Sequence, residues 1–221
     1  MSILLPLYVY PWPGSWDPLY WEAAKNPNLN FKVILNPCSG PCMGSLPETP
    51  YINEIPRLKD YPNIKTLGFD EIPGLYHWQK HDYLRSATNA VQSNKNLGEK
   101  IIVHNPGTLP DWTWNYLDLA NITVIFEDTF AHFIDATKFN ALKNFSTLSN
   151  SPTSAFSIML HSFGNVPNEL VEWTVTQMKH MAEWNFATDV AVAGEYWHSF
   201  PSILDVFITR YAQLKEQERG R

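Results

Sequence analysis

The sequence predicts an α/β fold, a (β/α) barrel of the TIM type, and three observations favour it. Short apolar runs, of the kind that form buried parallel strands, recur along the whole chain. Amphipathic stretches separate these runs, so strand and helix alternate. Proline, glycine and asparagine follow several runs and indicate loops at the C-terminal ends of strands. At 221 residues the chain is at the small end for such a barrel, and we expect one domain over residues 1–221.

Seven strands are predicted, one fewer than in a complete barrel. They occupy residues 4–10, 31–36, 64–69, 101–105, 122–127, 155–161 and 187–193. The amphipathic stretches between them include residues 16–25, 76–94, 131–142, 168–184 and 203–218. We expect the loops that follow the strands to form the rim of one cleft, among them Pro11-Trp12-Pro13-Gly14, Asn36-Pro37 and Asn105-Pro106-Gly107-Thr108.

The composition argues against nucleic acid and membrane partners. The net charge is −6 and the pI is about 5.6, so the chain has no basic footprint for a nucleic acid. No apolar run approaches the ~20 residues of a membrane span, and residues 1–6 show neither the basic segment nor the cleavage site of a signal peptide. The sequence as written therefore predicts a cytoplasmic protein, and it gives no indication of an oligomeric state.

Two cysteines and one histidine pair are possible metal ligands in this sequence. Cys38 and Cys42 lie in a turn-rich loop and lack the other two ligands of a structural zinc site, so free thiols are favoured over a local disulfide, and metal ranks third. His77 and His81 have a zinc-compatible helical spacing, but the glutamate of the zincin pattern is missing. An exposed helix face is the better interpretation of that pair. We expect no metal and no cofactor.

Two apolar runs end in acidic residues, which suggests a pair of catalytic carboxylates. Residues 64–69 lead into Asp70 and Glu71, and residues 122–126 lead into Glu127. The C-terminal tips of the strands are where a β/α barrel carries its chemistry. Two acids in one cleft can hydrolyse a glycosidic bond, because one transfers the proton while the other attacks or activates water.

Each acid also has a structural alternative. Asp70 and Glu71 can cap the following helix or face solvent, but the Ile72-Pro73-Gly74 turn ends their strand and lets both reach the cleft. Glu127 follows five largely apolar residues, where a buried carboxylate without a partner is costly. Glu127 is the favoured proton donor, and Asp128 beside it is predicted to cap the next helix.

Polar residues at the ends of other predicted strands are candidates for binding substrate hydroxyls. They are Tyr8, Tyr10, Asn36, His104, Asn105, His161 and Asp189. A hydrogen bond that serves only the fold is the alternative for each, and for His161 and Asp189 it is the more common outcome.

Five segments follow one another along nearly the whole chain in an order typical of a known family. They are Leu5-Pro6-Leu7-Tyr8-Val9-Tyr10-Pro11, Val33-Ile34-Leu35-Asn36-Pro37, Phe69-Asp70-Glu71, Val103-His104-Asn105-Pro106-Gly107-Thr108 and Phe126-Glu127. In these segments the chain resembles the spherulin-4 family. The resemblance implies a fungal glycoside hydrolase of β/α-barrel fold, active without a cofactor on α-1,4-linked galactosamine or N-acetylgalactosamine polymers such as galactosaminogalactan. It also implies that Asp70, Glu71 and Glu127 are the catalytic acids, and that an extracellular or cell-wall location is an alternative to the cytoplasm.

One departure from the family concerns the region before Asp70. The segment resembling Ile64 to Gly68 is a strand of its own in the family, followed by a loop, a helix and a separate strand that carries Phe-Asp-Glu. Here Leu67-Gly68 runs directly into Phe69-Asp70-Glu71, so about 30 residues, one strand-helix unit, are absent. A splice form, a gene-model error and a real deletion would each produce this. The alternatives to a hydrolase are therefore a non-catalytic carbohydrate-binding or spore-wall protein and an inactive truncated isoform.

Overall fold

The structure is a computed structural model. It describes residues 2–7, 14–35, 60–61, 64–66, 101–110, 116–191 and 200–219, together with residues 78, 81, 82, 85, 89 and 92.

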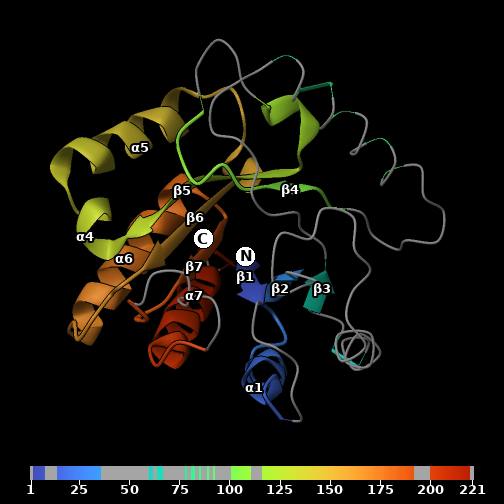
Figure 1. The fold of residues 1–221 in the computed structure, drawn as a ribbon. Helices are drawn as coiled ribbons and strands as arrows, with labels where there is room; N and C mark the ends of the chain where they lie inside the picture. Colours follow the sequence, from blue (N-terminus) through green and yellow to red (C-terminus); the bar gives the residue numbers. More distant parts are fainter. Residues whose placement is uncertain are drawn as a thin grey trace.

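The described strands form one parallel sheet, which confirms the predicted α/β class. The strands are β1 (Ser2–Leu7), β2 (Asn30–Leu35), β3 (Ile64–Thr66), β4 (Val103–His104), β5 (Ile122–Thr129), β6 (Phe156–His161) and β7 (Trp184–Ala187). Their order in the sheet is β3-β2-β1-β7-β6-β5-β4, and every described pair is parallel. Figure 1 shows the strands in the middle of the molecule with helices around them.

The helices follow the predicted alternation with the strands. They are α1 (Asp17–Lys25), α4 (Phe130–Phe133), α5 (Ala136–Leu148), α6 (Asn168–Met181) and α7 (Leu204–Arg219), with short 3₁₀ turns η1 (Leu117–Leu119) and η2 (Thr153–Ala155). The six described residues within the predicted helix 76–94 are also helical. No helix in the described part of the chain is long and apolar enough to cross a membrane.

The strand order is that of a ring opened at one point. Read in a circle, the sheet follows the chain from β1 to β7, and only β3 and β4 stand at its two ends. The described residues show no pairing between these two strands, so a closed seven-stranded TIM barrel is not shown. Residues 67–102, most of which lie outside the described part of the chain, connect these two strands, and they include the point where the sequence predicts a missing strand-helix unit.

The last strand lies earlier than predicted. The sequence favoured a helix to residue 184 and a strand over 187–193, whereas α6 ends at Met181 and β7 covers Trp184–Ala187. The backbone N–H of Ala182 closes the helix on the carbonyl of Met178, and the side chain of Asn185 donates to the carbonyl of Ala182 at 2.7 Å. Asn185 is fully buried, and the bond from its amide nitrogen lets a polar residue stand within a core strand, where it interrupts the apolar pattern.

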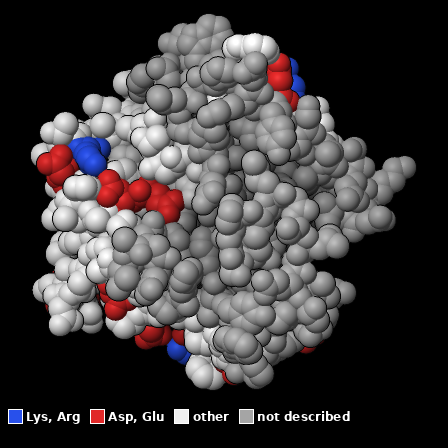
Figure 2. Space-filling view, viewed as in Figure 1, with Lys and Arg blue, Asp and Glu red and all other residues white. Residues whose placement is uncertain are grey.

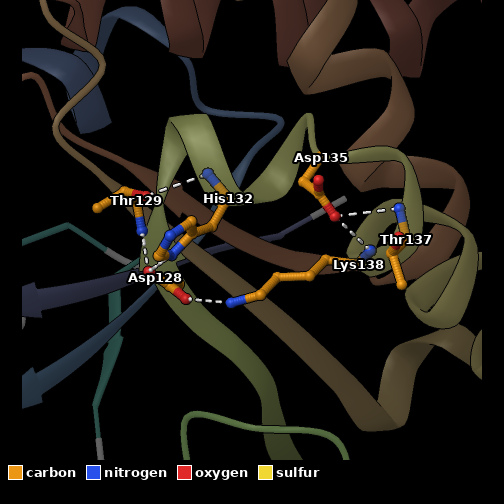
Figure 3. Close-up of polar contacts among 6 residues, drawn as sticks. All are labelled: Asp128, Thr129, His132, Asp135, Thr137 and Lys138. Atoms are coloured by element: carbon orange, nitrogen blue, oxygen red, sulfur yellow. Dashed lines mark hydrogen bonds and ion pairs between the residues drawn. The ribbon is translucent and has the colours of Figure 1, made fainter.

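The single helix predicted over residues 131–142 is two helices. Asp135 lies between the two helices and caps the N-terminus of α5. Its Oδ1 accepts the N–H groups of Thr137 and Lys138 at 3.1 and 3.2 Å (Figure 3). Thr129 caps α4 through the N–H of His132 at 3.1 Å. The cap is therefore Thr129, and the prediction that Asp128 caps this helix is wrong.

The core lies on both faces of the central strands. Residues 156–160 of β6 are all buried, as expected of a strand that is covered by helices on one side and by other core residues on the other. Aromatic side chains fill the layer beneath α4 and α5, where Phe126 meets Phe133 and Phe145 meets Phe156. Large buried rings of this kind supply much of the hydrophobic stabilisation. The core thus fixes the C-terminal ends of β4, β5 and β6, where the candidate site lies.

Candidate active site

Strand β5 contains a bulge just before its acidic end. Val124 lies opposite Ser157 and Phe126 lies opposite Ile158, so Ile125 is an extra residue in β5. Side chains alternate between the two faces of a strand, and an extra residue exchanges the faces for all that follows. The bulge therefore decides which acid points toward the helices.

Glu127 faces away from the helix layer. Phe126 packs edge to face against Phe133 of α4, with ring centroids 6.0 Å apart, and Asp128 bonds to His132 of the same helix. Both neighbours of Glu127 thus point to the helices. Glu127 lies on the opposite face of the strand, away from α4.

The side chain of Asn105 holds the carboxylate of Glu127. Asn105 directly follows β4, is buried, and donates from Nδ2 to Oε2 of Glu127 at 2.5 Å. Strand β4 pairs in parallel with β5, so the two residues meet at the same edge of the sheet. The structure therefore brings together two of the residues that the sequence singled out.

A glycine in the same loop supports Glu127 from its backbone. The carbonyl of Gly107 accepts the N–H of Glu127 at 2.9 Å. Gly107 has a φ of +64°, and a Cβ added there would lie 3.4 Å from the Cβ of Glu127. A side chain at this position would be strained by the positive φ and its Cβ would touch Glu127, so glycine suits the close approach. From sequence Gly107 is predicted only to form a turn, and its place in Asn105-Pro106-Gly107 is the one signal in the sequence that points to its role at the site.

His104 is buried beside Asn105. It is 3% exposed, and its Nδ1 has no hydrogen-bond partner among the described residues. Burial lowers its pKa to about 4, and the nearby Asp118 of η1 opposes this only in part. His104 is therefore neutral near pH 7. The predicted contact with substrate stays a prediction.

His161 stands at the end of β6, close to the acidic end of β5. Its Nδ1 shares a hydrogen bond of 2.8 Å with Oγ of Ser162, whose φ of +58° is rare outside glycine. Burial lowers the pKa of His161, while Asp128 acts to raise it and His132 to lower it. The predicted role of His161 in substrate binding stays a prediction.

Asp128 ties the end of β5 to α4 and α5. Its Oδ1 accepts the N–H of Thr129 and Nδ1 of His132, both at 2.7 Å, and its Oδ2 accepts Nζ of Lys138 at 3.0 Å (Figure 3). Burial acts to raise the pKa of Asp128, but these three donors together hold it at about 2. Figure 2 shows a strip of acidic side chains over the region where β5 leads into α4, with a basic side chain among them near the edge of the molecule.

Asp189, which follows β7, is bonded to the start of the last helical segment. Its Oδ1 accepts the N–H of Ser202 at 2.9 Å, and its Oδ2 accepts the hydroxyl of the same residue. These bonds fasten the loop after β7 to the residues before α7. The predicted role of Asp189 in substrate binding stays a prediction.

Several predicted residues lie outside the described part of the chain. They are Tyr8, Tyr10, Asn36, Asp70, Glu71, His77 and the two cysteines, Cys38 and Cys42. His81 is described, and the prediction that it lies on an exposed helix face is wrong. It is 8% exposed, stacks on Tyr116, and has Nε2 3.3 Å from Oδ1 of Asp118 and Nδ1 3.4 Å from Arg85.

The fold and the site define an α/β protein with a carboxylate held at the C-terminal edge of a parallel sheet. Comparison with family profiles identifies the group: the chain belongs to the spherulation-specific family 4, whose profile matches residues 2–69 and 69–210. The match is in two parts that meet at Phe69. That is where the sequence analysis places the missing strand-helix unit.

A solved structure is similar over the same length. The crystal structure of Aspergillus clavatus Sph3 in complex with GalNAc has a TM-score of 0.82 and 30% sequence identity, over 96% of this chain and 97% of that chain. The sugar in that crystal is N-acetylgalactosamine. A comparison with curated proteins gave no match.

Proposed function

We propose that the chain is a glycoside hydrolase that cleaves polymers of α-1,4-linked galactosamine or N-acetylgalactosamine, with Glu127 as an essential acid. The observation that carries the proposal is the placement of Glu127. The bulge at Ile125 turns it away from the helices, and Asn105 and Gly107 hold it at the C-terminal ends of β4 and β5. Membership of the family and the GalNAc-bound neighbour support an amino sugar as the ligand.

In the proposed reaction Glu127 and Asp70 act as the acid/base and nucleophile pair, and Glu71 assists. Two carboxyl groups about 5 Å apart would favour retention through a covalent intermediate, and a clearly larger separation would favour other routes. The acetamido group of the substrate is the alternative nucleophile. Asn105 and His161 lie at the same sheet edge as Glu127, which is where a sugar hydroxyl would be bound.

The cyclic strand order supports a β/α barrel as the scaffold of this site. The described sheet follows chain order around a ring with one opening, as expected of a barrel that lacks one strand-helix unit. The site residues come from β4, β5 and β6, which are consecutive in the sheet, and β4 is one of its two end strands. A polysaccharide substrate would also imply a location at the cell wall.

The proposal is tested by reducing-end release from partly deacetylated α-1,4-galactosamine polymer. We expect the parent to release reducing ends and Glu127→Gln to be slower by about 10²- to 10⁴-fold, the usual effect of removing a general acid or base. Glu169→Gln, at an exposed position in the first turn of α6, is the matched control and should keep the parent's rate. Undiminished release by Glu127→Gln would contradict the proposal.

A second candidate function is binding of the same polymer without cleavage. The division of the family match at Phe69 favours it, because Asp70 and Glu71 follow that point directly. A barrel with a lost unit there would keep Glu127 and its supports and lose the partner acid. Polymer binding by both the parent and Glu127→Gln, without reducing-end release by either, would select this function.

A further inference from the structure

We propose that Asn105 is a positioning residue for Glu127: it fixes the orientation of the carboxyl group and assigns the transferable proton to Oε1. This inference rests on the proposed function, in which Glu127 exchanges a proton with the substrate. It gives Asn105 a role different from the substrate contact that the sequence suggests.

The hydrogen bond between the two side chains carries the assignment of the proton. The amide nitrogen of Asn105 only donates, and it lies 2.5 Å from Oε2 of Glu127. The carbonyl oxygen of a protonated carboxyl group is the better acceptor, so the oxygen that accepts this N–H is the one without the proton. When Glu127 is protonated, this bond therefore favours the proton on Oε1 over Oε2.

The orientation is fixed because the support itself is fixed. Asn105 is 9% exposed, so its side chain has little freedom to choose another rotamer. Two positions further on, Gly107 accepts the N–H of Glu127 at 2.9 Å and approaches its Cβ without a side chain of its own. One short loop therefore holds Glu127 at its backbone, its Cβ and its carboxylate. Positioning of this kind is what a reacting group needs for a high rate.

The same bond predicts the direction of a pH effect. A donor on a carboxylate favours the ionised form, so its removal favours the protonated form. A general acid works while it is protonated, so the alkaline limb of the pH-rate profile should move to higher pH in Asn105→Ala. Asn105→Asp, which has nearly the same shape, should move it further because a second negative charge then lies against Glu127.

A second asparagine provides a matched control. Asn121 precedes β5, and its Oδ1 accepts the N–H of Ile102, which precedes β4, at 2.8 Å. It therefore joins the same two strands as Asn105, but at their N-terminal ends and away from Glu127. Asn121→Ala should lower the unfolding temperature while leaving kcat and the pH profile unchanged.

The experiment measures kcat, KM and the pH-rate profile of the full chain on the galactosamine polymer for all three variants. We expect both Asn105 variants to lose about 10- to 100-fold in kcat with KM unchanged, and their alkaline limbs to move upward. A raised KM with an unmoved limb would overturn the proposal, because it would make Asn105 a substrate ligand. An equal loss of kcat in Asn121→Ala would also overturn it, by showing that any weakening of this strand pair suffices.

A readout without substrate separates this inference from the proposed function. Carbon-13 NMR follows the titration of the Glu127 carboxyl, and Glu127→Gln identifies its signal by removing it. The midpoint should rise in Asn105→Ala and rise further in Asn105→Asp. If it rises although no polymer is cleaved, the positioning of the carboxyl stands and the hydrolase assignment fails. If it does not move, the positioning role is overturned whatever the activity.

Discussion

Asn105 and Glu127, 22 positions apart in the chain, are joined by a hydrogen bond of 2.5 Å across the ends of β4 and β5. Parallel strands are connected by a crossover, so residues that meet at one sheet edge are necessarily distant in sequence. The bond links the loop after β4 to the acid at the end of β5. Substitutions of Asn105, of Glu127 or of Gly107, which lies next to both, should therefore alter the same site.

Gly107→Ala should reduce activity more than Gly164→Ala. Both glycines have positive φ, +64° and +61°, so each substitution carries a similar backbone penalty of about 1 kcal/mol. Only at position 107 would the new methyl group meet Glu127, at 3.4 Å, since nothing lies within 4 Å at position 164. Urea unfolding measures the shared cost, and polymer cleavage measures the difference. Equal activities in the two variants would show that the contact with Glu127 has no functional effect.

Asp128 should make folding stability depend on pH in the acidic range. Its pKa is about 2 in the folded protein against an ordinary 3.8, so its contribution is present above about pH 4 and is lost as the pH falls toward 2. We expect the parent to lose about 1 kcal/mol more over this range than Asp128→Asn, after allowance for solvent screening. Urea unfolding at several pH values is the measurement.

The lysine partner of Asp128 provides the control for that prediction. Lys138→Met removes the ion pair at 3.0 Å and should reduce the acid dependence of stability. Lys143→Met changes an exposed lysine on the same helix, α5, and should leave that dependence as in the parent. Identical behaviour of the two lysine variants would contradict a role for the Asp128 cluster.

His104 should make the free energy of unfolding decrease as the pH falls from about 6.5 to about 4. Its pKa is about 4 in the folded protein, below the ordinary 6.5, so over this range the unfolded chain takes up a proton that the folded chain does not. We expect His104→Gln to remove about 2 kcal/mol of this pH dependence, whatever its absolute stability. The test compares the change in unfolding free energy from pH 7 to pH 4 in the two proteins. Parallel slopes would show that His104 titrates normally.

Asp189→Ala and Ser202→Ala should both lower stability. Asp189→Ala removes both hydrogen bonds that tie the loop after β7 to the segment before α7, at a cost of about 2 kcal/mol, whereas Ser202→Ala removes only the hydroxyl bond, at a cost of about 1 kcal/mol. Thermal unfolding measures this, and KM for the polymer separates it from substrate binding. A raised KM in Asp189→Ala alone would support the substrate contact that the sequence suggests. A common loss of stability with unchanged KM would assign Asp189 to the fold.

The strand pattern was accessible from sequence wherever buried strands are purely apolar. Residues 122–127 and 155–161 were predicted almost to the residue, because both faces of β5 and β6 are buried. The strand β7 was misplaced because Asn185 interrupts its apolar run. Its amide nitrogen donates to the carbonyl of Ala182, which is a bond that only the folded backbone offers. The predicted helix over residues 131–142 is divided at Asp135 for a similar reason. The cap is a hydrogen bond from the folded backbone to a side chain, and the apolar pattern does not contain it.

The sequence by itself determined the alternation of strand and helix, the family, and Glu127 as an acid at the end of an apolar run, because apolar periodicity and strand-end chemistry are local properties of the chain. Only the tertiary structure decided that Glu127 faces away from the helices, that Asn105 holds it, and that His81 and His104 are buried. These outcomes depend on a one-residue bulge at Ile125 and on parallel pairing between distant segments. Register and long-range contact are set by packing of the whole sheet, and no local pattern of residues encodes them.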